Sequence, residues 1–481
     1  MQTNKDEIFR DILKNLREEN LAIFAGAGMS LDSGYVNWSD LLRPIANELE
    51  LNIEKEFDLV ALAQYHCNEF LSRSKINQIL IDEFSQNVTS SKKHDILARL
   101  PINTYWTTNY DKLIEKTIET SGKVPDIKYT NSHLSYTKPN RDVVIYKMHG
   151  DVEHPESAII TRDDYESYHR KMEPFFTALA GDLVSKTFLF IGFSFTDPNL
   201  DYILGRVRQT YGKDRRRHYC FIRKVKKKEN EDNAEYDYRI KKQHLFIKDL
   251  RRFNIISILI DEYLEIENFL EELEKTYRRD CVFISGAAHE YGKWDRNDAE
   301  RFVYRLSKAI IANDFKIVSG FGLGIGSMVI SGALEEIYGN LVKHSKDDLI
   351  LKPFPQKVYG DLGKSEMWYN YRNDMISYAG VAIFLFGNKF EDDKVIKSNG
   401  MREEFIIAKE KGLFLLPIGI TGYISEDFQN EIQSNFNEFY PDINQILETK
   451  LRNLYQNNNI ENVDEIISNI IDILKIIRNP F

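Results

Sequence analysis

An imidazole, an amide and a carboxylate stand directly after two strand-like stretches in the N-terminal half of the sequence. Asn109 and Asp111 follow residues 102–108, a β-branched and aromatic run, and His149 follows residues 143–148. Imidazole is the natural general base near neutral pH, and an amide can hold a sugar hydroxyl or a water through its two-sided hydrogen bonding. These side chains predict acid–base chemistry on a hydroxyl-bearing substrate. The alternative for His149 is a structural histidine at a strand end.

A glycine turn earlier in the chain predicts a binding site for phosphate. The apolar residues 21–25 end at Gly26-Ala27-Gly28, and Ser30 follows. Glycine permits positive φ and the close approach of a ligand, and a helix that begins at such a turn directs free N–H groups at an anion. The pattern favours a nucleotide pyrophosphate on this turn, with a plain structural turn as the alternative.

The elements that must position these residues follow a repeated order of strand, polar tip and helix. The polar tips are residues 26–30, 109–111, 149–151 and 192–197, the last of them after a strand at 187–191. This order is typical of a parallel sheet with helical crossovers, in which ligands bind at the carboxyl ends of the strands. We therefore expect the four tips to meet at one site.

The same order restarts near residue 281, after a Glu-rich helix at residues 263–279. Strands are expected at residues 281–284, 316–319, 381–386 and 413–419. Glycine-rich loops follow the first two strands, and residues 423–481 have the pattern of a polar helical cap. The predicted fold class is α/β with two Rossmann-like domains, residues 1–278 and 279–481.

Composition excludes several classes of protein. The chain has 481 residues and a net charge of −10, which argues against a general nucleic-acid binder. Its three cysteines form no Cys-x-x-Cys pair, so neither a disulfide framework nor a four-cysteine zinc site is expected within the chain. The N-terminus lacks a secretory signal, and no apolar run approaches the ~18 residues of a membrane span. We therefore expect a cytoplasmic protein with no membrane or nucleic-acid partner.

Three motifs in this order, GAGMS, TTNYD and KMHGD, resemble those of the sirtuins. The later stretch GFSFTDPNLD resembles a nucleotide-contacting loop of bacterial defence sirtuins. The resemblance implies an N-terminal sirtuin-like domain with NAD+ as its substrate. It also implies that Asn109 positions ribose or water and that His149 is the catalytic base. The nucleotide contacts that it implies are Ala27, Gly28, Asp111, Gly192, Ser194 and Asp197.

One departure from the sirtuin pattern separates two reactions. Deacylase sirtuins carry a zinc module with two Cys-x-x-Cys pairs, which three scattered cysteines cannot supply. Cleavage of the ribose–nicotinamide bond forms an oxocarbenium-like centre and needs no metal, because the pyridinium leaves as a neutral base. We therefore expect NAD+ to be hydrolysed to ADP-ribose and nicotinamide. The alternatives are a NAD+-dependent deacylase or ADP-ribosyltransferase and a non-catalytic nucleotide sensor.

The C-terminal half resembles the SLOG family, relatives of the cytokinin-activating phosphoribohydrolases. Those enzymes use an Arg on a helix and a Glu after a Gly-rich turn, and Arg372 and Glu404 stand at the matching places. Residues 397–400 replace the enzymatic Pro-Gly-Gly-x-Gly-Thr loop, so binding is expected rather than phosphoribohydrolase activity. The alternative is that Arg372 and Glu404 only pair with each other on a surface. The predicted ligand contacts are Gly286, Ala287, Gly322, Gly324, Arg372, Lys389, Gly400 and Glu404.

A sirtuin-like half followed by a SLOG half resembles the effectors of the Thoeris antiphage system. The resemblance implies that the SLOG domain binds a cyclic ADP-ribose isomer made by a partner enzyme with a TIR domain. It implies that this signal activates NAD+ hydrolysis, which depletes the NAD+ of the cell. It also implies a homotetramer.

Overall fold

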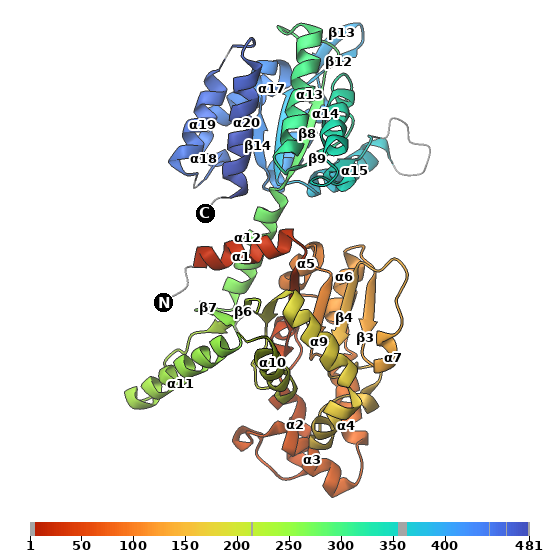
Figure 1. Ribbon diagram of the computed structural model, residues 1–481, viewed down its shortest axis with the longest axis vertical. Coiled ribbons are helices and arrows are strands. Elements are labelled where there is room, and N and C mark those ends of the chain that lie inside the picture. The colour runs from red at the N-terminus through yellow and green to blue at the C-terminus, as the bar shows by residue number, and fades with distance from the viewer. Residues whose placement is uncertain (1–4, 213–214, 355–362, 442, 458, 480–481) are drawn as a thin grey trace. The chain divides into compact units, whose positions relative to one another are not determined.

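The computed structural model describes residues 5–212, 215–354, 363–441, 443–457 and 459–479. It divides into two compact units, Met1–Glu274 and Lys275–Phe481, and the chain passes from the first to the second within helix α12 (Leu264–Arg278). Each unit contains a parallel β-sheet with helices packed against it (Figure 1). The predicted α/β class with two parallel sheets is confirmed.

In the described part of the N-terminal unit, seven parallel strands form a sheet in the order β3-β4-β2-β1-β5-β6-β7. Strand β1 lies between β2 and β5, with Ile23 opposite Tyr105 on one side and Leu189 on the other. Every residue of β1 and β5 is buried, as expected for a parallel sheet that is covered on both faces. The strands are β1 (Leu21–Ala25), β2 (Thr104–Thr107), β3 (Pro125–Lys128), β4 (Val143–Lys147), β5 (Thr187–Ile191), β6 (His218–Arg223) and β7 (Ile255–Ile260).

Helices of the N-terminal unit connect these strands and cover the sheet (Figure 1). They are α1 (Lys5–Arg17), α2 (Trp38–Glu48), α3 (Leu59–Phe70), α4 (Ser74–Phe84), α5 (Lys92–Arg99), α6 (Leu113–Thr120), α7 (Asn131–Leu134), α8 (Arg162–Lys171), α9 (Glu173–Ser185), α10 (Pro198–Tyr211) and α11 (Asn233–Arg252). The prediction of a helix directly after the first glycine turn is wrong. Two 3₁₀ turns, Ala27–Met29 and Leu31–Ser33, stand there instead, and α2 begins only at Trp38.

In the described part of the C-terminal unit, five parallel strands form a second sheet in the order β10-β9-β8-β11-β14, beside the antiparallel hairpin β12–β13. The strands are β8 (Cys281–Ala287), β9 (Lys316–Ser319), β10 (Leu349–Leu351), β11 (Val381–Phe386), β12 (Asn388–Glu391), β13 (Lys394–Lys397) and β14 (Phe414–Pro417). The helices are α13 (Arg296–Ala312), α14 (Gly326–Gly339), α15 (Lys364–Ser377), α16 (Asn399–Glu410), α17 (Tyr423–Ser434), α18 (Phe436–Phe439), α19 (Gln445–Gln456) and α20 (Val463–Arg478).

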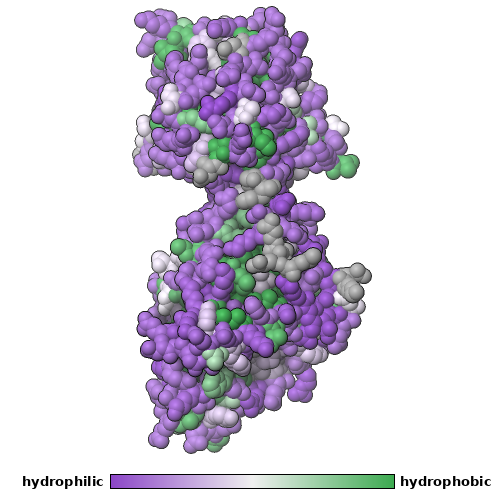
Figure 2. Space-filling model, turned by 90° about the vertical axis from the view of Figure 1, so that its left-hand side faces the viewer, coloured by the Kyte–Doolittle hydropathy of each residue, from purple (hydrophilic) through white to green (hydrophobic). Residues whose placement is uncertain are grey.

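The C-terminal cap is helical as predicted, but it is not simply polar. Helix α20 buries seven residues, among them Ile470 and Leu474, within the core of the unit. Elsewhere the face of the molecule in Figure 2 is mostly hydrophilic, with hydrophobic side chains in small groups. Among the described residues, no helix combines the length and the apolar character that a membrane crossing requires.

Candidate functional site

A cavity of about 400 Å³ lies at the carboxyl ends of the strands in the N-terminal unit. Such a volume falls in the range of pockets for small molecules and cofactors. The polar tips that follow β1, β2, β4 and β5 all contribute to its wall, as the strand order requires. The lining includes every residue predicted for this site: Ala27, Gly28, Asn109, Asp111, His149, Gly192, Ser194 and Asp197.

Asn109 is held by one end of its amide. Its Nδ2 donates to the carbonyl oxygen of Gly26 and to Ser30 Oγ, both at 3.1 Å, and its backbone N donates to Thr107 Oγ1 at 3.0 Å. The side chain is buried, and Oδ1 has no hydrogen-bond partner among the described residues. Because a buried acceptor without a partner is unfavourable, Oδ1 is well placed to accept a hydrogen bond from a ligand or a water.

Asp111 acts on Asn109 through Ser30. Ser30 Oγ donates to Asp111 Oδ2 at 2.8 Å while it accepts from Asn109, and the backbone N of Leu113 donates to Asp111 Oδ1 at 3.0 Å. Both carboxylate oxygens of Asp111 are therefore engaged within the protein. Ser30 is the last residue of the GAGMS motif but is not among the predicted site residues, and its position in the motif is the signal that could have identified it.

His149 lies next to a carboxylate in the lining of the cavity. Its Nε2 lies 3.0 Å from Oδ2 of Asp197, and both side chains are buried. No described residue makes an aligned hydrogen bond to this nitrogen. Burial opposes the ionisation of Asp197, but the interactions with His149 and the backbone N–H groups of Leu200 and Asn199 together outweigh it, so the pKa of Asp197 lies below its usual range. An imidazole that accepts a proton here would therefore be stabilised by a neighbouring negative charge.

Two further parts of the cavity consist of residues that were not among the predicted site residues. Tyr165 on α8 packs edge-on to the His149 ring at 5.6 Å, and its hydroxyl lies 3.4 Å from Asp197 Oδ2. Burial raises the pKa of Tyr165 well above its ordinary value, so the hydroxyl stays protonated. An apolar wall completes the cavity. It consists of Tyr35, Val36, Trp38, Leu41, Val60, Phe84 and Tyr110.

The glycines of the first site bring two strand-end loops together. Gly28 N donates to the carbonyl oxygen of Gly192 at 2.9 Å, and Gly192 has φ +66°. A Cβ on Gly192 would lie 2.2 Å from the backbone nitrogen of Met29. These glycines are therefore required for contact between the loops after β1 and β5. The N–H of Gly28 is already used within the protein.

The predicted second site lies at the carboxyl ends of strands in the C-terminal unit. A Cβ on Gly322 would lie 1.8 Å from the carbonyl oxygen of Gly286, and one on Gly324 would lie 1.9 Å from that of Ala288. The loop after β9 is thus packed directly on the end of β8. Ala287 is the last residue of β8, between these two contacts.

Arg372 and Glu404 are paired, with Arg372 buried and Glu404 partly buried rather than exposed on the surface. Arg372 Nε lies 3.7 Å from Glu404 Oε1, Ser285 Oγ donates to Glu404 Oε2 at 2.6 Å, and burial raises the pKa of Glu404. A Cβ on Gly400 would lie 2.9 Å from Arg372 Nη2, so this glycine leaves room for the guanidinium. Among the described residues, Lys389 pairs with Glu391 in the β12–β13 hairpin and not with Arg372 or Glu404.

Metal ligands do not cluster in the part of the chain that the structure describes. No group of three or more His, Cys, Asp or Glu side chains there could hold a metal ion. The three cysteines, Cys67, Cys220 and Cys281, are free, and burial raises the pKa of both Cys220 and Cys281 to about 12.

Comparisons with known proteins agree with this arrangement of two units. Residues 103–243 match the SIR2-like domain, and residues 265–477 match the Sir2- and TIR-associating SLOG family. The chain is 51% identical to the NAD(+) hydrolase ThsA of Bacillus cereus (strain MSX-D12) over 477 residues, which is 98% of each chain. It is 47% identical to the NAD(+) hydrolase ThsA of Acinetobacter baumannii (strain 532279), over 97% of this chain and 98% of that one.

A more distant relative matches in part. The Defense-associated sirtuin 2 of Bacillus subtilis is 27% identical over 223 residues, which is 44% of this chain and 21% of that protein. The full-length matches at about half identity, together with the two domain matches, decide the family. The chain belongs to the NAD(+) hydrolase ThsA family, in which a SIR2-like domain precedes a SLOG domain.

Proposed function

We propose that the N-terminal unit hydrolyses NAD+ to ADP-ribose and nicotinamide as part of a bacterial defence against phage. The observation that carries the proposal is that two buried polar atoms on one cavity are free to hydrogen-bond to a ligand or a water. Asn109 Oδ1 and His149 Nε2 both lack an aligned partner among the described residues, and both residues line the same space. The relatives named as NAD(+) hydrolases over the whole chain support the same reaction.

The reaction requires only a water and a base in addition to NAD+. The bond between ribose C1′ and the nicotinamide nitrogen breaks, and its electron pair goes to that nitrogen, so nicotinamide leaves neutral. The water oxygen then bonds to the oxocarbenium-like C1′ while a proton passes from the water to His149 Nε2. Asp197 stabilises the imidazolium, and Asn109 Oδ1 accepts a hydrogen bond from the water or a ribose hydroxyl. The apolar wall suits the flat nicotinamide ring.

The C-terminal unit provides the proposed regulation. The ligand is a cyclic ADP-ribose isomer from a TIR-domain partner enzyme, and a buried guanidinium is a suitable contact for its phosphates. Arg372 Nε has no hydrogen-bond partner among the described residues, which supports this assignment. Activation requires that the ligand bind one state of the protein more tightly than the other, and in this proposal a homotetramer in the cytoplasm transmits the preference.

The test measures NAD+, nicotinamide and ADP-ribose by chromatography, with and without cyclic ADP-ribose isomers. Wild type should release equal amounts of nicotinamide and ADP-ribose. Asn109→Ala and His149→Ala should each lose at least about a hundredfold in kcat, in line with the contribution of a general base. An acyl-lysine peptide in a parallel reaction separates hydrolysis from deacylation, because a deacylase would consume NAD+ only with the peptide. Turnover at the wild-type rate by either variant would refute the catalytic assignment of that residue.

A further inference from the structure

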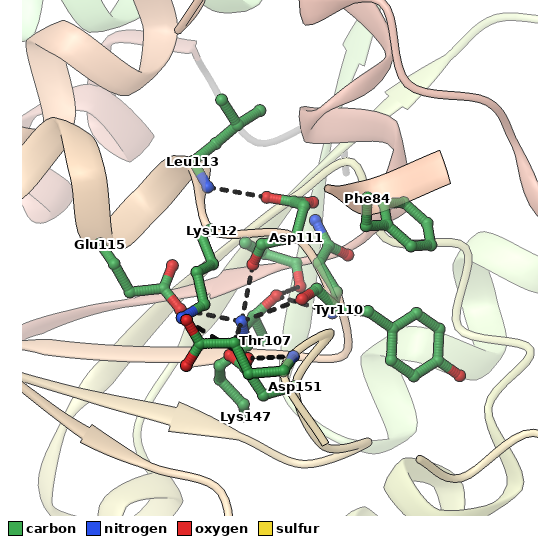
Figure 3. A network of polar contacts seen from close by, with 12 residues as sticks. Phe84, Thr107, Tyr110, Asp111, Lys112, Leu113, Glu115, Lys147 and Asp151 are labelled. Atoms are coloured by element: carbon green, nitrogen blue, oxygen red, sulfur yellow. Dashed lines mark hydrogen bonds and ion pairs between the residues drawn. The ribbon is translucent and has the colours of Figure 1, made fainter. Parts of the chain in front are cut away.

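A fully buried lysine lies directly beneath the proposed catalytic loops. Lys147 is the last residue of β4, two positions before His149, and its side chain has no exposed surface. A buried ammonium is costly unless charged and polar partners surround it. Figure 3 shows such a set of partners around Lys147, contributed by Glu115, Asp151 and the loop that contains Tyr110 and Asp111.

The ammonium contacts the backbone of the loop that carries Asn109. Lys147 Nζ donates to the carbonyl oxygen of Asp111 at 2.6 Å and to that of Tyr110 at 3.2 Å. These carbonyls belong to the two residues that follow Asn109 in the chain. The lysine therefore fixes the backbone that determines where the Asn109 amide lies.

Two carboxylates complete the set, one from each side. Glu115 Oε1 on α6 lies 2.8 Å from Lys147 Nζ, and Asp151 Oδ2, two residues after His149, lies 2.6 Å away. Burial alone would lower the pKa of Lys147, but Glu115 and Asp151 outweigh it and raise that pKa, so the side chain stays charged. Asp151 is also anchored in its own loop, since its Oδ1 accepts from Glu153 N at 2.9 Å. One ammonium thus joins the Asn109 loop to the His149 loop.

Resting on the proposed NAD+ hydrolysis, we propose that Lys147 is a positioning residue that sets the geometry between Asn109 and His149. Lys147 is not itself a lining residue of the cavity, and it acts through the loops after β2 and β4. A displacement of about 1 Å between catalytic groups can lower the rate about a hundredfold. The network therefore affects turnover more than the binding of NAD+.

The main variant is Lys147→Met, which keeps an unbranched side chain of nearly the same length and removes its charge. We expect kcat to fall about a hundredfold with little change in KM, because the groups are misplaced while the cavity wall is intact. Removing only the lysine leaves two buried carboxylates uncompensated, which could prevent folding. The double variant Lys147→Met/Glu115→Gln removes one of them, and Asp151 retains Lys112 at 3.8 Å. It should fold and show the same loss of kcat.

Lys128→Met is the matched control. Lys128 lies on β3 of the same sheet, is also buried, and pairs with Asp126 at 2.8 Å, but it does not line the cavity. This variant should lower the midpoint of thermal unfolding and leave kcat unchanged.

Two results would overturn the inference. One is wild-type kcat in a folded Lys147 variant, single or double. The other is an equal loss of kcat in Lys128→Met, which would show that any lost buried lysine reduces activity. If neither Lys147 variant folds, Glu115→Gln decides in their place, because it keeps the pair with Asp151, and an unchanged kcat there also counts against the inference. The absence of hydrolysis by wild type would instead refute the proposed function itself.

Discussion

Replacement of Asp197 by Asn tests whether this carboxylate serves the base or the nucleotide. The sequence placed Asp197 among the nucleotide contacts, whereas the structure places its Oδ2 3.0 Å from His149 Nε2. Its other oxygen caps α10 by accepting from Leu200 N at 3.0 Å. Asn is also a strong helix N-cap, so Asp197→Asn removes the charge and keeps the cap and the volume.

The expected magnitude follows from the charge that develops at His149 as it accepts a proton. A hydrogen bond to a charged group contributes about 1.5–3 kcal/mol, and this contribution is made only when the imidazolium forms. Its loss therefore lowers kcat, by about 10- to 150-fold, and leaves KM nearly unchanged. Initial rates of nicotinamide release across a range of NAD+ concentrations give both quantities.

Asp201→Asn is the control, because Asp201 is an exposed carboxylate one turn further along the same helix. It should leave both kcat and KM unchanged. A rise in KM with wild-type kcat in Asp197→Asn would refute the reasoning. It would show that Asp197 binds the nucleotide equally in the ground state and the transition state, as the sequence motif suggested.

Three further predictions concern stability and the second site. Burial lowers the pKa of His218 from 6.5 to about 3, so the folded chain stays neutral there while the unfolded chain takes up a proton. The free energy of unfolding is therefore not reduced by this group above pH 6.5, and below that pH it falls by about 1.4 kcal/mol per pH unit. His218→Gln should make the midpoint of thermal unfolding fall less steeply between pH 6.5 and 5. Gly192→Ala should lower the midpoint of thermal unfolding by more than about 4 °C, because the added Cβ would lie 2.2 Å from a backbone atom and residue 192 has a left-handed backbone conformation. An unchanged midpoint would contradict the packing described for this loop. Arg372→Met should abolish the proposed activation by cyclic ADP-ribose isomers, measured as nicotinamide release, while basal turnover persists. Retained activation would exclude Arg372 as a contact.

The strands that hold the site were predictable because they are short runs of apolar, aromatic and β-branched residues. Strands β1, β5 and β11 are mostly hydrophobic runs, and each is followed directly by a glycine. Parallel pairing brings the carboxyl ends of the strands in each sheet to the same side of that sheet. The tips after β1, β2, β4 and β5 therefore met in one cavity as expected.

Other elements carried too weak a local signal. Strand β3 at the sheet edge begins with Pro125 and contains two charged residues, so its pattern does not favour a strand. In helix α11, Leu250 is the single buried residue. Without an apolar face, the 20 residues of this helix show little helical periodicity in the sequence. The contact between His149 and Asp197 could not be predicted either, because 48 residues separate them and only the fold brings them together.

The glycine motifs predicted the right places for a reason that the sequence alone does not reveal. A glycine needed for ligand approach and a glycine needed for chain packing look the same in the sequence, because both uses require the absence of Cβ. In both units the structure shows chain packing: Gly28 lies against Gly192, and Gly322 lies against Gly286. Each contact brings a loop onto the end of a neighbouring strand, where a parallel sheet forms its crevice. The motif therefore locates the crevice, whereas Asn109 Oδ1, His149 Nε2 and Arg372 Nε, which have no aligned hydrogen bond among the described residues, indicate where a ligand would bind.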